Sequence, residues 1–227
     1  MKTRITFISD THTKHNQITN DLPGGDILCH SGDISSMGYR GEIESFCKWF
    51  DAIDNYNHKI FIAGNHDWGF QNNHKEAMEV VSSYKTIKYL QDSFIICDGI
   101  KIYGTPWQPE FCNWAFNLPK NGDALRATWD LIPADTDILL THGPAFGILD
   151  DVDGRRGDHL GCELLTKRIQ MVKPKIHSCG HIHSGNGYYN NGDTHFINAA
   201  VLGERYTYDY EPLTIDWDST TNELIKV

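Results

Sequence analysis

The sequence predicts an α/β fold with a mixed β-sheet, and three observations support this class. Apolar runs of strand length alternate with segments of helical periodicity, turn residues separate them, and one pair of runs is joined by Asp98 and Gly99. At 227 residues the chain is long enough for one substantial core. We therefore take residues 1–227 as a single domain.

The expected strands are short apolar runs bounded by turn residues. They cover residues 4–9, 26–31, 58–64, 94–97, 101–104, 136–143, 174–180 and 194–200, with two closing strands within 212–227. The runs on either side of Asp98 and Gly99 form the clearest hairpin, because this dipeptide suits a two-residue turn. Apolar residues at helical spacing predict helices over 41–54, 72–84 and 160–172.

Residues 104–133 break this alternation, since they mix aromatic side chains with proline and glycine and contain only a short helical end. Trp107, Phe111, Trp114 and Phe116 either cover a pocket or pack the segment locally. We favour local packing, although long ordered loops often contribute to binding sites.

The composition excludes several classes of protein. The chain carries 20 Lys and Arg against 30 Asp and Glu, a formal charge of -10, which disfavours a long nucleic acid as the partner. No apolar run reaches the roughly 20 residues of a membrane span, and no export signal follows Met1. We therefore expect a cytoplasmic protein without a membrane partner, and its six scattered cysteines are expected to be reduced thiols.

Side chains that commonly bind metals lie at the ends of five of the expected strands. Asp10 and His12 are two residues apart, and we expect them on one face of the chain. The same spacing leads us to expect His181 and His183 to point the same way. The remaining members of the set are Asp33, Asn65, His66 and His142.

The position and chemistry of these side chains indicate a metal site. Ligands of α/β proteins bind outside the carboxyl ends of the strands, so the five strand ends can converge. Oxygen and imidazole donors without thiolate suit Mn, Fe or Zn in a catalytic site. Seven ligands, namely this set without His66, exceed the needs of one ion that keeps a position for water, so we expect two ions sharing a carboxylate. Glycines beside the ligands permit close approach of the backbone: Gly32, Gly64, Gly143 and Gly180.

The ordered motifs "DTH", "GD", "GNHD", "THG" and "GHIH" resemble those of the calcineurin-like metallophosphoesterase superfamily, and they span residues 10–183. The stretches "LPGGDILCHSGD", "IYGTPWQP", "LLTHGPAFGILD" and "GCELL" resemble the small subfamily of metallophosphoesterase-domain-containing proteins, which is similar to class III cyclic nucleotide phosphodiesterases. The resemblance implies a four-layer αββα sandwich of two mixed β-sheets flanked by helices.

The resemblance also implies roles for the individual residues. Asp10, His12 and His183 hold the first metal together with Asp33, which bridges to the second. Asn65, His142 and His181 complete the ligand set of the second metal. His66 contacts the substrate phosphate, as Asn65 also can, or protonates the leaving group, so that His66 and Asp33 are the expected catalytic residues.

Simpler interpretations exist for single motifs, and the conjunction of five in family order outweighs them. We expect Asp67 to cap the following helix, with a secondary role in orienting His66. Arg155 and Arg156 are candidates for binding a substrate phosphate, but we favour pairing with the acidic residues around them.

The function hypothesis is hydrolysis of small phosphodiesters, cyclic nucleotides among them, by a hydroxide that bridges two divalent ions, with Mn favoured. A phosphomonoesterase or nucleotidase, a nuclease, and a protein phosphatase at the same site are the alternatives. A non-catalytic scaffold is disfavoured because every expected ligand is retained. The loops over 104–133 and 144–160 are expected to decide between diester and monoester, and self-association is left open.

Overall fold

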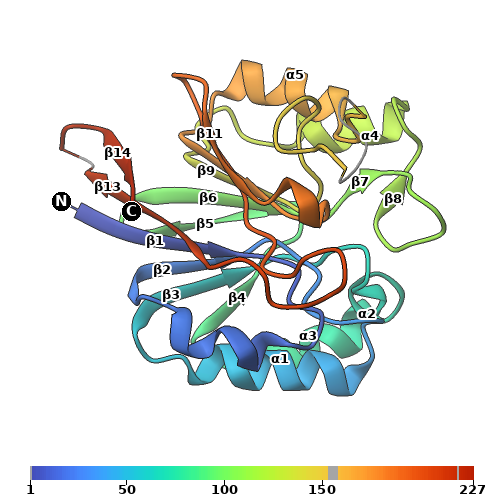
Figure 1. The fold of residues 1–227 in the computed structure, drawn as a ribbon. Helices are drawn as coiled ribbons and strands as arrows, with labels where there is room; N and C mark the ends of the chain where they lie inside the picture. The colour runs from blue at the N-terminus through green and yellow to red at the C-terminus, as the bar shows by residue number, and fades with distance from the viewer. Residues whose placement is uncertain (1, 153–157, 219) are drawn as a thin grey trace.

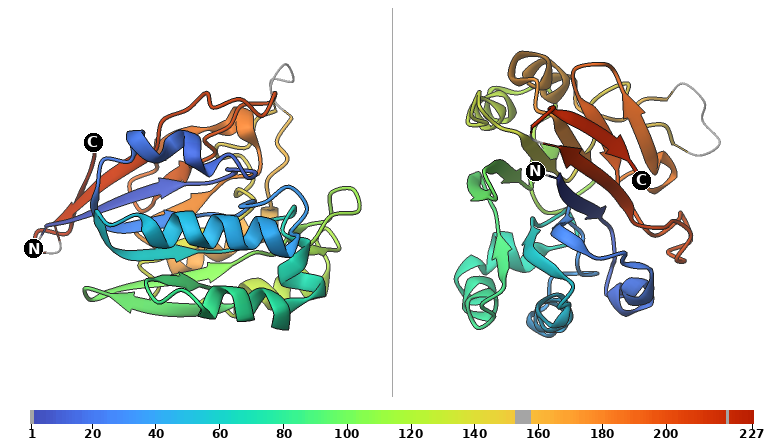
Figure 2. Two further views of the ribbon diagram at one scale, coloured as in Figure 1. Left: turned by 90° about the horizontal axis from the view of Figure 1, so that it is seen from below. Right: turned by 90° about the vertical axis from the view of Figure 1, so that its left-hand side faces the viewer.

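The computed structural model describes residues 2–152, 158–218 and 220–227. Two six-stranded mixed sheets pack face to face, and helices cover the outer face of each (Figures 1 and 2). This arrangement confirms the α/β class and the four-layer sandwich implied by the resemblance. Four adjacent strands run parallel in each sheet, and the antiparallel strands lie toward the edges.

The first sheet contains the two ends of the chain, because the N-terminal strand pairs with the closing hairpin. Its order is β14 (Glu223–Lys226), β13 (Leu213–Asp218), β1 (Lys2–Ile8), β2 (Gly25–His30), β3 (Tyr56–Phe61) and β4 (Ile87–Tyr89). The second sheet is formed by the middle of the chain. Its order is β11 (Gly187–Asn190), β12 (His195–Asn198), β10 (Ile176–Cys179), β9 (Ile138–Thr141), β6 (Ile100–Thr105) and β5 (Ser93–Cys97).

The helices fall into two groups, one on each outer face (Figure 1). The first sheet is covered by the 3-10 helix η1 (His15–Asp21) and by α1 (Arg40–Ala52), α2 (Trp68–Asn72) and α3 (His74–Ser82). The second sheet is covered by α4 (Asp123–Asp130) and α5 (Glu163–Val172). A second 3-10 turn, η2 (His183–Gly185), follows β10.

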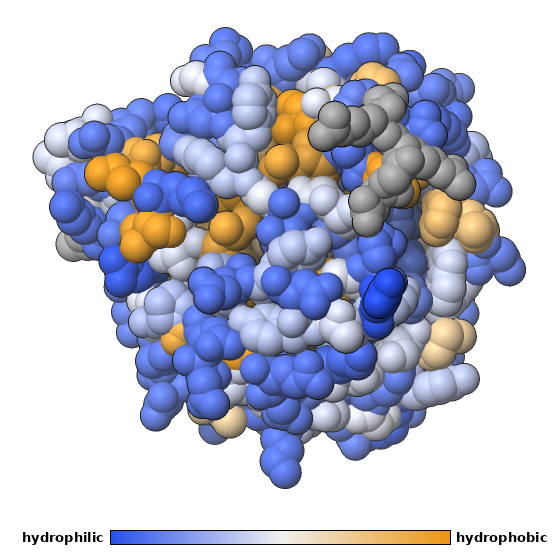
Figure 3. Space-filling model, viewed as in Figure 1, coloured by the Kyte–Doolittle hydropathy of each residue, from blue (hydrophilic) through white to orange (hydrophobic). Residues whose placement is uncertain are grey.

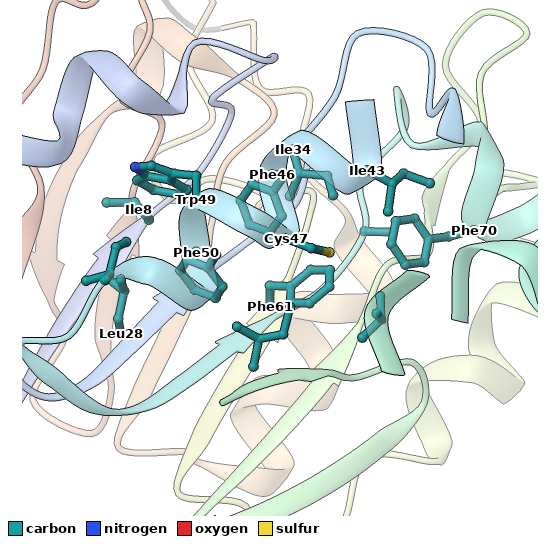
Figure 4. Close-up of a cluster of buried hydrophobic side chains, with 14 of the residues drawn as sticks. Ile8, Leu28, Ile34, Ile43, Phe46, Cys47, Trp49, Phe50, Phe61 and Phe70 are labelled. Atoms are coloured by element: carbon teal, nitrogen blue, oxygen red, sulfur yellow. The ribbon is translucent and has the colours of Figure 1, made fainter. Parts of the chain in front are cut away.

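Both faces of the central strands are buried, and alternate residues contribute to different cores. In β9, Ile138 and Leu140 pack between the sheets, whereas Leu139 packs under α4 and α5. In the first sheet, Phe61 packs against Phe46 and Phe50 of α1 (Figure 4). Side chains that alternate across a strand therefore bind each sheet to its partner on one side and to helices on the other.

Several expected elements have different boundaries. The segment expected as one helix over 72–84 is preceded by α2, and Asn73 separates α2 from α3. The predicted hairpin is confirmed as β5 and β6, and Asp98 and Gly99 both have positive φ, as a tight turn of this type requires. The elements η1, β4 and β11 were not expected, and residues 104–133 contain the short parallel pair β7 (Gln108–Pro109) and β8 (Asn117–Leu118) besides α4.

The surface is mainly hydrophilic. Hydrophilic residues occupy most of the face shown in Figure 3, with smaller apolar groups among them. Within the described residues, every helix is too short or too polar to cross a membrane.

Candidate metal centre

The loops that carry the candidate ligands meet at one side of the sandwich (Figure 1). They follow β1, β2 and β3 of the first sheet and β9 and β10 of the second. Within each sheet these strands are parallel, so their carboxyl ends lie at the same edge. The loops are also joined across the sheets, because the backbone nitrogen of His181 donates to the Asp10 carboxylate at 3.0 and 3.1 Å.

The backbone turns sharply at the ligands and is not extended there. Asp10, His12, Asp33 and His181 have positive φ values of 56°, 38°, 55° and 68°. The alternation of side chains along a strand therefore does not orient these pairs. We expected Asp10 and His12 to share one strand face, and His181 and His183 to share another, and this reasoning was wrong. Left-handed backbone at residues other than glycine is uncommon, and such conformations cluster at functional sites.

Three overlapping groups of side chains are close enough to hold a cation. They are Asp10, His12 and His183; His12, Asp33 and His66; and Asp10, Asp33 and His142. Asp10 belongs to the first and third groups, and Asp33 belongs to the second and third. The two carboxylates therefore lie between the imidazoles. His183 Nε2 lies 3.4 Å from Asp10 Oδ1, and His142 Nε2 lies 3.4 Å from Asp33 Oδ2.

Backbone carbonyls orient three of these imidazoles. His142 Nδ1 donates to Ser31 O at 3.0 Å, and His183 Nδ1 donates to Gly203 O at 3.1 Å. His66 Nδ1 donates to Ser36 O at 2.8 Å. A carbonyl only accepts, so Nδ1 carries the proton and Nε2 is presented to the site in each case. Such hydrogen bonds fix the tautomer and ring position of metal-binding histidines.

The interior of the site has acceptors facing one another. His142 Nε2 lies 2.8 Å from Asn65 Oδ1, and both are acceptors when the ring is neutral. Burial lowers the pKa of His142, but Asp33 and Asp10 outweigh it and raise the pKa to about 9. Burial likewise opposes the effect of Asp10 on His183, whose pKa is raised to about 9. The site thus favours positive charge at its centre, which a bound cation provides while displacing the protons.

His12 gives an independent indication that the site suits a bound cation. It is 3% exposed, and among the described residues neither of its ring nitrogens has a hydrogen-bond partner. Its Nε2 lies 3.9 Å from Asp10 Oδ1 and 3.6 Å from Asp33 Oδ2. A cation coordinated by all three would satisfy this buried imidazole, so the residues present fit a metal centre.

Asn65 and His181 lie at the same centre, although neither belongs to the three groups. Both line a cavity of about 150 Å³ together with His12, Asp33, His66 and His183. The ring of His181 lies 5.1 Å from that of His142, centre to centre. All seven expected ligands are therefore close together, whereas Arg155 and Arg156 lie outside the described residues.

Asp67 does not cap α2, contrary to our expectation. It is the residue before the helix, but its side chain makes no capping hydrogen bond. Its buried carboxylate accepts from the backbone nitrogens of Gly64, Ile34 and Ser35 and from Ser35 Oγ, at 2.5 to 3.2 Å. The residue therefore joins the loop after β3 to the loop after β2.

Aromatic side chains surround the cavity and contact the histidines. Trp114 stacks on His66 with ring centres 4.1 Å apart, and Phe111 lies edge-on to His181 at 5.7 Å. Tyr206 lies edge-on to both His12 and His183, at 4.8 and 5.3 Å. Our prediction of local packing is therefore correct for the buried Phe116 and for Trp107, which lies against it. The same prediction was wrong for Phe111 and Trp114, which contact the histidines.

Tyr206 was missed by the sequence analysis. It follows none of the motifs, and its backbone has a φ of 57°. Its carbonyl accepts from Lys14 Nζ, and its nitrogen donates to Gly203 O at 2.8 Å. The turn that places this ring over the site depends on contacts distant in sequence, so only its proximity to the motifs in space identifies it.

The fold and the donor set together define an α/β protein with a candidate metal centre of carboxylates and imidazoles at the carboxyl ends of its parallel strands. The family model of calcineurin-like phosphoesterases matches residues 3–185. The chain therefore belongs to the calcineurin-like metallophosphoesterase family, whose members act on phosphoesters with divalent metals.

Individual relatives agree with this assignment. Metallophosphoesterase domain-containing protein 1 of Homo sapiens is 38% identical over 241 residues, which cover 97% of this chain and 72% of the relative. A UPF0046 protein of Caenorhabditis elegans is 36% identical over 230 residues, covering 95% and 81% of the two chains. The crystal structure of TT1561 of Thermus thermophilus shares the fold, with a TM-score of 0.67 at 14% identity over 100% of this chain and 99% of that one.

Proposed function

We propose that the chain hydrolyses small phosphodiesters, cyclic nucleotides among them, at a centre of two divalent cations, with manganese as the favoured metal. The observation that carries this proposal is the pair of buried carboxylates, Asp10 and Asp33, set between imidazoles that present Nε2 to them. A charged pair of this kind is stable when it coordinates metal.

In the proposed assignment, the first ion would be held by Asp10, His12, Asp33 and His183, and the second by Asp33, Asn65, His142 and His181. When bound, the ions lower the pKa of water and stabilise negative charge on phosphate oxygens. The donor set contains oxygen and nitrogen atoms without thiolate, which suits manganese better than a structural zinc site.

The residues of the chain supply the remaining chemistry. His66 N donates to Asp33 Oδ1 at 2.8 Å and thereby fixes the carboxylate. The His66 ring is held between Ser36 O and the face of Trp114. Its Nε2 is presented to the site, and an imidazolium protonated on both nitrogens would donate from Nε2, so we assign His66 as the proton donor to the leaving group.

The surroundings favour a small diester. A second cavity of about 560 Å³ adjoins the metal centre and shares Phe111 and His181 with it. Its volume suits an organic group attached to the phosphate. The net charge of -10 disfavours a polynucleotide.

The test compares a chromogenic phosphodiester with the corresponding monoester, using protein loaded with manganese. We expect faster hydrolysis of the diester, with turnover lost in Asp33→Asn and kept in Asp54→Asn, which alters an exposed aspartate. Faster hydrolysis of the monoester would instead indicate a phosphomonoesterase. Metal-loaded protein that hydrolyses neither would indicate a scaffold.

We further propose a cytoplasmic location. All six cysteines lie in the described part of the chain and are free, and five of them are buried. Unpaired thiols are typical of reducing compartments. Retention of the protein in the cytosolic fraction of its cells tests this proposal.

A further inference from the structure

One side chain at the edge of the metal centre has no part in the proposed hydrolysis. Tyr206 lines the cavity of about 150 Å³ that also contains His66 and several of the expected ligands. Its ring lies edge-on to His12 and His183, and the residue is 41% exposed, so a ligand can reach it. Among the described residues, its hydroxyl has no hydrogen-bond partner. The hydroxyl is therefore left to bond to whatever occupies the cavity.

The turn from Gly203 to Thr207 fixes this ring at the centre. Tyr206 N donates to Gly203 O at 2.8 Å, and Gly203 N donates to Thr207 O at 2.9 Å. Gly203 O also accepts from His183 Nδ1 at 3.1 Å, so one carbonyl orients an expected ligand and closes the turn that carries Tyr206. Lys14 Nζ donates to Tyr206 O from the loop after β1. A bulky side chain at a positive φ, here 57°, is rare, and such backbone persists where surrounding contacts impose it, often at functional sites.

The hydroxyl lies within the field of the two central carboxylates. Burial raises the pKa of Tyr206, and the negative charges of Asp33, Asp10 and Glu204 raise it further. The hydroxyl is therefore close enough to Asp33 and Asp10 to sense their charge. A phenol keeps its proton at neutral pH even without such an effect, so Tyr206 Oη is a hydrogen-bond donor at the centre.

A phosphodiester at this centre would need donors as well as cations, because its non-bridging oxygens only accept hydrogen bonds. Apart from the imidazoles expected to bind metal, the described cavity-lining residues with a side-chain donor are Asn65, His66, Trp114 and Tyr206. His66 follows Asn65 in the chain and stacks on Trp114, so the first three of these donors lie together. Tyr206 packs on His12 and His183, the two imidazoles proposed for the first ion. It therefore offers a donor beside that ion.

We propose that the Tyr206 hydroxyl donates a hydrogen bond to a non-bridging oxygen of the substrate phosphate, beside the first ion. The inference rests on the proposed function, since it takes a phosphate to be bound at this centre. Tyr206 is then a further substrate-binding residue. A hydrogen bond to a charged oxygen is stronger than one between neutral groups, so its loss should weaken the binding of every phosphate ligand, whatever its leaving group.

The experiment compares the parent protein with Tyr206→Phe, which keeps the ring and removes the hydroxyl. Calorimetric titration of manganese-loaded protein with inorganic phosphate should give a Kd about tenfold higher in the variant. The kcat/KM values of methyl 4-nitrophenyl phosphate and methyl phenyl phosphate should fall by the same factor, because the contact does not involve the leaving group. Tyr189→Phe, at a tyrosine of β11 that is 49% exposed, should match the parent. All three proteins should bind manganese fully.

The inference is overturned if phosphate does not bind the manganese-loaded parent, or if Tyr206→Phe binds it as tightly as the parent does. Loss of manganese in the variant would also overturn it, because the ring would then only support the ligands. A loss of kcat/KM confined to methyl phenyl phosphate would place Tyr206 at the leaving group and reject the contact proposed here. If Tyr206→Phe does not fold, as a melting curve would show, Tyr206→Gly, which suits the positive φ, provides the same comparison of Kd.

The two readouts separate this inference from the proposed function. A tenfold difference in Kd without turnover of either ester by the parent would support the phosphate contact and reject the hydrolase. Turnover of both esters, with equal Kd and kcat/KM in the parent and in Tyr206→Phe, would reject the phosphate contact alone.

Discussion

At the scale of single residues, the centre depends on glycines that let loops approach one another. A Cβ on Gly180 would lie 2.0 Å from Asp10 Oδ2 and 2.2 Å from Ser9 Oγ. A Cβ on Gly64 would lie 2.3 Å from Asp33 Oδ1. Real Cβ atoms do not approach so closely, so the two carboxylates have their positions only because glycine is present opposite them.

We therefore predict that Gly180→Ala displaces Asp10, loses most bound manganese and lowers the free energy of unfolding by about 2 kcal/mol or more. Gly143→Ala is the matched control, because the nearest atom to its Cβ is Gln108 Cβ at 3.6 Å, an ordinary contact. Metal content and denaturant unfolding measure both variants. Full metal content in Gly180→Ala would contradict the prediction.

His66 is predicted to act on the leaving group and not to hold metal. The His66→Ala variant should keep its bound manganese and lose about 10²-fold or more turnover on diesters with poor leaving groups. Esters that release 4-nitrophenolate should be affected far less, because this group leaves without protonation. Loss of metal in the variant would instead make His66 a ligand, as its proximity to His12 and Asp33 allows.

At the scale of elements, the site is built by loops that hold each other. The loops after β1 and β2 are joined by hydrogen bonds from Asp10 N to Gly32 O and from His12 N to Asp33 O, at 2.9 and 3.0 Å. The loop after β9 is joined to that after β10 by Gly180 N and His142 O at 2.8 Å. Asp67 joins the loops after β2 and β3, so the ligands move only if several loops move together.

Asp67→Ala should for this reason destabilise the protein more than a helix-terminal substitution. It leaves four buried donors without their acceptor, and we expect a loss of about 3 kcal/mol. Asp123→Ala, in the exposed first turn of α4, should cost less than about 1 kcal/mol. Urea unfolding compares the two, and equal losses would refute the role of Asp67 as a connection between loops.

Element positions were predictable from the sequence where the local pattern is strong. The hairpin of β5 and β6 follows from an Asp-Gly turn, and α1 follows from apolar residues at helical spacing. The role of Asp67 was not predictable in this way. An aspartate before a helix is a typical cap, and the donors that it accepts from belong partly to residues more than 30 positions away.

At the scale of the whole molecule, the candidate ligands come from both sheets. Asp10, His12, Asp33 and Asn65 follow strands of the first sheet, and His142, His181 and His183 follow strands of the second. The sheets are also joined directly by Ser31 Oγ and Ser178 Oγ at 2.8 Å. A cation at this centre would connect the two halves of the sandwich.

Metal binding is accordingly predicted to stabilise the whole fold. Manganese at about 100 times its Kd should raise the free energy of unfolding by about 2.7 kcal/mol per site, and a chelator should reverse the shift in Tm. Calorimetric melting curves with and without manganese measure this effect. Asp33→Asn should show little shift, whereas a parent protein whose Tm does not respond to manganese would contradict the dinuclear centre.

The sequence by itself determined the α/β class and the chemistry of the centre. Hydrophobic periodicity is a local property, and the donor atoms and glycines are present in the residues themselves. The tertiary structure alone decided the left-handed turns at His12 and His181 and the place of Tyr206. It also decided the hydrogen bond that Gln108 Nε2 donates to Asn117 Oδ1. These features depend on contacts between segments far apart in the sequence, and no local pattern of residues encodes such contacts.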